Sequence, residues 1–279
     1  MRTALVDIGE LGWSLYLSAH ARYLIEKEQK EVVIVTFPER FPLYEFVHET
    51  ISVPNDFYPE FGQYPKQCLG LYGSDEEALR DFFLTVIPKD SQFPDWFRFN
   101  CIWNFQNKTV YKPYPISILQ KPPLNRRILM FPRFRSEPVF SWRNLSKRFW
   151  INLGEALSET FLNFTITAVG TKDGAYDLKE LEGIANFENL VGRTKTVQSV
   201  IDLCGESVGA VGSASSLPKL SLLQQVPTFT IGHEKQRCEK ENVLGTRFGF
   251  YEVDKDGYGS LPEEPCTTEV IHFFQGKKP

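Results

Sequence analysis

A turn of small residues in the C-terminal half of the chain has the composition of an anion-binding site. Residues 208–231 (VGAVGSASSLPKLSLLQQVPTFTI) have the pattern of a strand, a small-residue turn, a helix and a second strand. The small side chains of residues 212–216 (GSASS) let a ligand approach the main chain, and the N–H groups that open the next helix carry partial positive charge. A phosphate or diphosphate would fit there. An ordinary βα loop with a serine N-cap has the same pattern.

Three arginines follow the strand expected at residues 127–131. Arg133, Arg135 and Arg143 lie in one predicted loop, at the edge where open α/β sheets bind ligands. A guanidinium makes paired hydrogen bonds to phosphate and keeps its charge, so it suits a nucleotide diphosphate that must be held while a bond to it breaks. The alternative is a solvated basic loop, because arginines are mostly exposed.

Near the N-terminus, a carboxylate lies in a glycine-flanked turn. Residues 7–13 (DIGELGW) place Glu10 between Gly9 and Gly12, where a strand enters a helix. The glycines let a substrate approach the backbone, and a carboxylate there could take the proton from an attacking hydroxyl. An acid at this position can also serve only to balance the helix dipole. Glu10 is therefore the candidate general base, with both roles open.

Further polar residues follow predicted strands in the C-terminal half. A Gly-Thr-Lys triplet comes after the strand expected at residues 163–169 and could line a nucleotide pocket. A histidine follows the last strand of the 208–231 pattern, where it could face a base or ribose. The four histidines have no metal-ligand spacing, so a surface or partly buried histidine is the alternative for each. These candidate ligands are Gly170, Thr171, Lys172 and His233.

Two other enzyme classes, a Rossmann oxidoreductase and an α/β hydrolase, find little support. The Gly9–Gly12 turn lacks the third glycine of the dinucleotide fingerprint, and the strand expected at residues 31–36 ends in Phe-Pro instead of an acid for the ribose. The chain has no Gly-x-Ser-x-Gly elbow of the kind that serves α/β hydrolases.

Size, charge and cysteine content narrow the class of protein. With 279 residues and 42% hydrophobic content, the chain can form one large domain or two of ordinary size. The net charge of −4 makes nucleic acid an unexpected main partner. Five scattered cysteines without C-x-x-C spacing argue against a disulfide framework and a zinc site, and favour a reducing cytoplasm. The first residues do not form a signal peptide, and no apolar run could span a bilayer, so we expect a soluble protein or a peripheral one.

The elements that must position these residues form two α/β halves. The first opens with a strand (3–8), a helix (13–28) and a strand (31–36), and consecutive prolines make residues 122–127 the expected linker. The domains predicted are 1–122, 123–262 and a C-terminal helix in 263–279 that crosses back to the first lobe. The second half is expected to contain strands 127–131 and 163–169, helices 146–161, 178–184 and 263–274, and the 192–231 unit.

The second half resembles a known family of enzymes. Residues 190–196 (LVGRTKT), then 211–220 (VGSASSLPKL) and a Val-Pro at 226–227 resemble the donor-binding half of heptosyltransferase-like glycosyltransferases with the GT-B fold. That family has Leu-x-Gly-[Lys/Arg]-[Thr/Ser], a Gly-x-Asp-Ser-Gly-x-x-His turn and a Val-Pro. The chain differs in having Ala214 at the Asp and Lys219 at the His.

Two shorter matches accompany this one. The arginine loop, followed by a helix with a tryptophan, is similar to the opening of the donor half in bacterial sugar transferases. The Gly-Glu-Leu-Gly-Trp string looks like the opening of some predicted polysaccharide glycosyltransferases, whereas heptosyltransferases tend to have Asp where Trp13 stands.

The resemblance implies two Rossmann-like lobes that face a cleft. The second lobe would bind a nucleotide-sugar donor and the first a glycan, glycolipid or other hydroxyl acceptor, without a metal or cofactor. The competing class is a degenerate, non-catalytic GT-B protein that binds only a nucleotide or glycan. Besides the residues named above, the implied donor ligands are Arg193, Ser213, Ser215, Ser216 and Lys219.

Overall fold

The structure is a computed structural model with two compact units. It describes residues 1–8, 11–53, 76–97, 112, 114–116, 126–136, 141–194, 196–255 and 257–277. The chain divides into Met1–Ile116 and Ser117–Pro279. Residues 117–125, which include most of the expected linker, lie outside the described residues, and the predicted domain boundaries stay predictions.

The first unit is a parallel sheet with the strand order β3-β2-β1-β4. All five residues of β2 are buried, which is typical of a parallel strand covered on both faces and explains the unbroken Val-Val-Ile-Val run. Leu5 of β1 pairs with Ile34 of β2, and neither is exposed to solvent. The elements are β1 (Arg2–Asp7), α1 (Leu11–Glu28), β2 (Val32–Thr36), η1 (Pro38–Tyr44), β3 (Glu49–Ser52), α3 (Glu76–Val86) and β4 (Ser91–Gln92).

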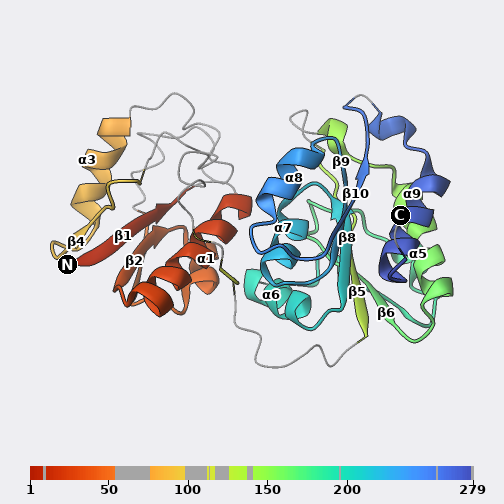
Figure 1. Cartoon of the computed structure of the whole chain (residues 1–279), viewed down its shortest axis with the longest axis horizontal. Helices are drawn as coiled ribbons and strands as arrows, with labels where there is room; N and C mark the ends of the chain where they lie inside the picture. Colours follow the sequence, from red (N-terminus) through yellow and green to blue (C-terminus); the bar gives the residue numbers. More distant parts are fainter. Residues whose placement is uncertain are drawn as a thin grey trace. The chain divides into compact units, whose positions relative to one another are not determined.

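The second unit is a larger parallel sheet with the order β10-β9-β8-β5-β6-β7. Helices α6, α7 and α8 lie on one side of it and α5 and α9 on the other (Figure 1). Its first elements are β5 (Arg127–Phe131), η3 (Ser141–Arg143), α5 (Lys147–Thr160), β6 (Thr165–Ala168), η4 (Lys179–Leu181) and β7 (Phe187–Asn189). The rest are α6 (Val197–Gly205), β8 (Gly209–Ser213), α7 (Ser216–Leu223), β9 (Thr228–Gly232), α8 (Lys235–Glu241), β10 (Phe248–Glu252), η5 (Tyr258–Ser260) and α9 (Glu263–Phe274).

Most predicted elements of the second half are present with nearly the expected bounds. The strand predicted at 127–131 is β5, and the helix predicted at 146–161 is α5, with Ser146 as its N-cap. The helix predicted at 178–184 is wrong. Only Lys179–Leu181 form a single 3-10 turn, and the chain continues through i→i+3 turns into β7.

The C-terminal helix α9 belongs to the core of the second unit. Cys266 and Val270 are fully buried in that core, and the ring of Phe273 lies 5.5 Å from that of Phe229 on β9. A crossing of this helix to the first unit stays a prediction.

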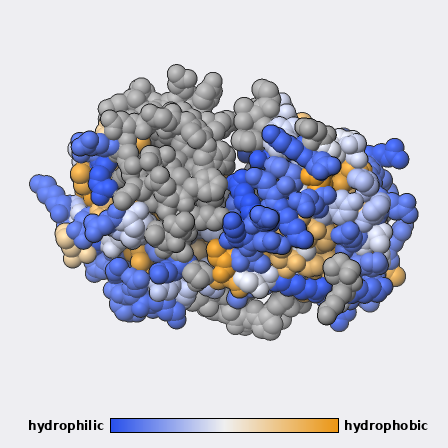
Figure 2. Space-filling model, turned by 45° about the horizontal axis from the view of Figure 1, so that its top comes forward, coloured by the Kyte–Doolittle hydropathy of each residue, from blue (hydrophilic) through white to orange (hydrophobic). Residues whose placement is uncertain are grey.

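The face of the second unit seen in Figure 2 is largely polar. In the view of Figure 2, hydrophilic residues dominate the described part of the second unit, with small hydrophobic areas between them. No helix in the described residues is long and apolar enough to cross a membrane.

Candidate functional site

Three strands of the second sheet end side by side at its carboxyl edge. Phe131 of β5 pairs with Gly212 of β8, and Ser213 of β8 pairs with Ile231 of β9. The loops after these strands therefore meet at one edge, as expected for a ligand site in an open parallel sheet. These loops carry the small-residue turn, the arginines and His233.

The turn after β8 is tightly built and ends at a helix N-terminus. A Cβ on Gly212 would lie 2.9 Å from the Cβ of Phe131 and 3.0 Å from Pro218, so only glycine fits there. The Ser213 side chain is 1% exposed, and its Oγ has no hydrogen-bond partner among the described residues. Ser215 is the N-cap of α7, but its side chain makes no capping hydrogen bond. The turn thus presents polar groups and helix N–H groups that a bound anion could satisfy.

An aromatic group lies next to this turn. The Nδ1 atom of His233 and the Tyr258 hydroxyl share a hydrogen bond of 3.0 Å. The Trp142 ring packs edge-on against both, at centroid distances of 4.9 Å from His233 and 5.7 Å from Tyr258. A Cβ on Gly232 would lie 2.9 Å from that of Ala214 and 3.5 Å from the Tyr258 hydroxyl. Gly232 therefore lies between the turn and the aromatic group, close to both.

Cations surround the aromatic group. The Arg143 guanidinium lies 5.0 Å from the centre of the Trp142 ring, and the Lys255 ammonium lies 5.6 Å from it. Burial lowers the pKa of His233, and the charges of Arg143 and Lys255 act in the same direction. Burial raises the pKa of Tyr258 to about 12. Near neutral pH both rings are therefore uncharged. Arg143 and Lys255 lie beside Trp142, and a Glu234 oxygen lies 3.8 Å from Nε2 of His233. The rings and the two cations together suit an aromatic base attached to phosphates.

The arginine loop is held in place next to β5. Arg133 is half-buried, and its Nη1 donates to Asn144 Oδ1 at 2.7 Å, while Arg135 is exposed. Phe134 N donates to Gly174 O at 3.0 Å, so the loop after β6 lies beside it. The loop after β6 and the loop after β7 both carry predicted ligands, and they lie next to each other at this edge. Gly170 is buried, Thr171 and Lys172 are exposed, and Gly192 N donates to Gly170 O at 2.8 Å.

Two predicted ligands are engaged in ion pairs. Lys219 Nζ lies 3.0 Å from Oε2 of Glu241, a side chain that is only 2% exposed, and Arg237 Nε donates to the other oxygen of this carboxylate. Arg193 pairs with Glu182 at 2.9 Å on the surface. Their roles as donor ligands stay predictions.

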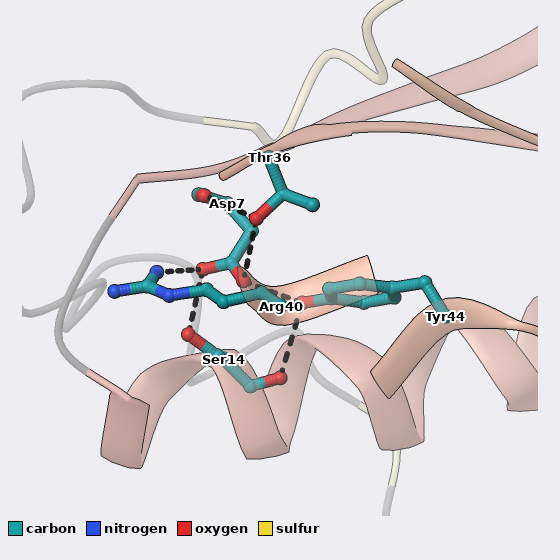
Figure 3. A network of polar contacts seen from close by, with 5 residues as sticks. All are labelled: Asp7, Ser14, Thr36, Arg40 and Tyr44. Atoms are coloured by element: carbon teal, nitrogen blue, oxygen red, sulfur yellow. Dashed lines mark hydrogen bonds and ion pairs between the residues drawn. The ribbon is translucent and has the colours of Figure 1, made fainter. Parts of the chain in front are cut away.

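In the first unit, the predicted base lies outside the described residues. Gly9 and Glu10 are not among them, and Gly12 is buried in the first turn of α1. The neighbouring Asp7 is fully buried, and its carboxylate accepts hydrogen bonds from Ser14 and Tyr44, each at 2.8 Å (Figure 3).

Asp7 also connects β1 to two further elements. Thr36 at the end of β2 donates to the Asp7 main-chain oxygen at 2.8 Å, and Arg40 of η1 forms an ion pair with Oδ1 at 3.1 Å. Figure 3 shows the five side chains converging between the strands and helix α1. Asp7 therefore ties the end of β1 to α1, β2 and η1.

The described residues contain no metal centre. No group of three or more His, Cys, Asp or Glu among them is placed to hold a metal ion. The chain has an Asp-x-Asp sequence at 254–256, in which Asp254 is exposed and Asp256 lies outside the described residues.

Comparison with known proteins gives the fold. No family model and no curated protein matches the sequence. Among solved structures, E. coli heptosyltransferase WaaC with ADP matches with a TM-score of 0.65 at 11% identity, over 98% of this chain and 100% of that one. The glycosyl transferase family 9 protein from Veillonella parvula DSM 2008 also matches with a TM-score of 0.65, at 8% identity, over 99% and 97%. The chain has the heptosyltransferase-like GT-B fold. This confirms the fold class predicted from sequence.

Proposed function

We propose that this protein is a glycosyltransferase that moves a sugar from a nucleotide-activated donor to a hydroxyl of a glycan or glycolipid. One observation carries the proposal. Cations, an aromatic group and the N-terminus of helix α7 converge at the carboxyl edge of the second sheet. The fold is shared with WaaC, whose structures contain ADP and ADP-2-deoxy-2-fluoro heptose.

Each part of this edge has a distinct role in the proposed reaction. Trp142 and the neutral His233–Tyr258 pair would contact the base or ribose. Arg133, Arg143 and the N–H groups that open α7 would bind the diphosphate. Because negative charge grows on the diphosphate as the sugar leaves, fixed donors and cations stabilise the transition state without a metal.

Acceptor activation is assigned to the first unit. Glu10 would take the proton of the acceptor hydroxyl as it attacks the anomeric carbon. Asp7 is poorly suited to that task, because its two oxygens already accept hydrogen bonds from Ser14, Tyr44 and Arg40 in a buried site. The cytoplasmic location, and peripheral binding to a membrane that carries a glycolipid acceptor, belong to the same proposal. Cell fractionation tests both.

A binding protein without catalysis is the second candidate. Lys219 stands where the resembling family has His, and its ammonium is paired with the buried Glu241. Ala214 stands at the family's Asp and has no polar side-chain atom. Two donor contacts of the family pattern are therefore replaced, which favours a chain that binds nucleotides but transfers nothing.

A thermal-shift screen against UDP-, GDP-, ADP- and CMP-sugars tests the donor site. A donor at a hundred times its Kd should stabilise the protein by about 2.7 kcal/mol. Arg143→Ala should weaken that binding by about 1.5–3 kcal/mol, the range for a charge-assisted hydrogen bond. Arg126→Ala, an exposed arginine before the opposite end of β5, is the control. The donor site is refuted if no nucleotide sugar binds.

Turnover separates the two candidates. The screened donor is incubated with acceptor mixtures, and release of the nucleoside diphosphate is measured. Glu10→Gln should slow release by about a hundredfold or more and leave donor affinity unchanged. Donor binding without any release, across lipid-linked and soluble acceptors, would support the binding protein.

A further inference from the structure

The side chain of Asn144 closes the arginine loop onto the short helix η3. Its Oδ1 accepts from the Arg135 main-chain N–H at 3.0 Å, and its Nδ2 donates to the Arg135 carbonyl at 2.8 Å. The same Oδ1 accepts from Arg133 Nη1 at 2.7 Å. Asn144 directly follows Arg143, the last residue of η3. One amide therefore contacts Arg133 and Arg135, and it directly follows Arg143 in the chain.

The main chain fixes which way the amide points. The Arg135 N–H needs an acceptor and its carbonyl needs a donor, so only one orientation of the Asn144 amide satisfies both. The oxygen then faces the Arg133 guanidinium. A carboxylate could not donate to the Arg135 carbonyl, and an aliphatic side chain could satisfy neither group.

A neutral acceptor is the useful choice for this position. A carboxylate at this position would offset the charge of Arg133, whereas the neutral amide oxygen orients the guanidinium without offsetting it. The contrast lies within the same unit, where the buried carboxylate of Glu241 is paired with Lys219 and Arg237.

The loop backbone has other attachments. Phe134 N donates to Gly174 O at 3.0 Å, and Tyr176 N donates to Pro132 O at 2.7 Å. Removal of the Asn144 amide would thus remove these contacts of Arg133 and Arg135 without detaching the loop from the sheet edge.

We propose that Asn144 is a positioning residue for anion recognition, which holds Arg133, Arg135 and Arg143 in the arrangement that binds the diphosphate of the donor. This inference rests on the proposed function. Asn144 acts through the arginines and need not touch the ligand.

A double-mutant cycle on nucleoside diphosphate binding tests the proposal. The Kd values of ADP, UDP, GDP and CDP are measured by calorimetry, and the diphosphate that binds best is carried forward. Asn144→Ala should raise its Kd about five- to twentyfold. In an Arg133→Ala background the same change should raise Kd by a clearly smaller factor, because the Arg133 guanidinium that Asn144 orients is gone while its contacts with Arg135 remain.

Two further variants separate positioning from stability. Asn144→Asp keeps the size and the acceptor but opposes the Arg135 carbonyl and cancels the Arg133 charge, so it should weaken binding at least as much as Asn144→Ala. Asn152→Ala is the matched control, since this asparagine on α5 donates to Glu263 at 2.9 Å. It should leave Kd unchanged. Circular dichroism and Tm show that each variant is folded.

The outcomes are distinct from a failure of the proposed function. An unchanged Kd in Asn144→Ala or Asn144→Asp overturns the positioning role, and so does an equal loss with and without Arg133. If Asn144→Ala does not fold, Asn144→Asp decides. If the wild type binds no diphosphate, or if Arg133→Ala and Arg143→Ala both bind as the wild type does, the donor site itself is wrong.

Discussion

The buried ion pair between Asp7 and Arg40 allows a test of what holds the first unit together. The Asp7 side chain is completely buried and that of Arg40 is 8% exposed, with 3.1 Å between Oδ1 and Nη1. The carboxylate also accepts from Ser14 and Tyr44 at 2.8 Å (Figure 3). Charges this deeply buried cost much to desolvate, so each depends on its partner.

The magnitude follows from leaving one buried charge without the other. Asp7→Asn keeps the size of the side chain but removes the charge that Arg40 faces, and we expect it to cost about 3–5 kcal/mol of stability. Arg40→Met leaves the carboxylate with its hydroxyl donors and should cost about 2–4 kcal/mol. The double variant has neither charge. It should cost less than the sum of the single variants, with a coupling of about 2 kcal/mol or more.

The assay must report on the first unit alone. Native-state amide hydrogen exchange at pH 7 follows the main-chain N–H groups of β1 and β2 for this unit, and those of β5 and β8 serve as the internal control. Only the first set should lose protection. Additive costs of Asp7→Asn and Arg40→Met would show that the two charges do not depend on each other, and the reasoning would be refuted.

Three further predictions concern single sites. Burial lowers the pKa of His20 to about 4, and its Nδ1 accepts from Lys112 N at 3.0 Å. In the unfolded chain the His20 imidazole is protonated near pH 6.5, so the first unit should lose about 3 kcal/mol of stability as pH falls from 6.5 to 4. His20→Asn does not titrate and should abolish this pH dependence, as measured by urea titrations at several pH values. Gly212→Ala should cost about 1–3 kcal/mol of stability in thermal melts, because the added Cβ meets rigid neighbours. The control Gly183→Ala meets nothing within 4 Å and should leave the same melts unchanged. Ser146→Ala removes the cap bond to the N–H of residue 149 (2.9 Å) and should cost about 1 kcal/mol by chemical denaturation; an unchanged midpoint would contradict it.

The fold was predictable where the signals are local. The continuous apolar run of β5, the capping serine before α5 and the Pro-Glu-Glu entry to α9 each specify an element within a few residues. Strand β7 has three residues and α8 has seven, too few to show a period. The helix expected at 178–184 failed because Leu178 and Leu181, buried with spacing three, satisfy one 3-10 turn as well as an α-helix.

The site was predictable in position but not in its contacts. Loops after parallel strands meet at one edge, so the arginines, the small turn and His233 could be grouped from sequence. Trp142 and Tyr258 could not, because their contacts with His233 join residues far apart in the chain. The contacts of Asp7 could not be predicted either, since its partner Arg40 lies 33 residues away.

Charge partners show which cations suit a ligand. Lys219 and Arg133 were both among the donor ligands expected from sequence, Lys219 at the place of the family's His and Arg133 in the loop after β5. The structure separates them: a buried carboxylate 2% exposed holds Lys219, and a neutral amide holds Arg133. The Glu241 carboxylate offsets the charge of Lys219, so this ammonium attracts a diphosphate less than an ammonium without a carboxylate partner would. Arg133 can keep its neutral amide acceptor when it contacts a phosphate, because a guanidinium has five N–H groups. Diphosphate affinity should therefore depend on Arg133 far more than on Lys219.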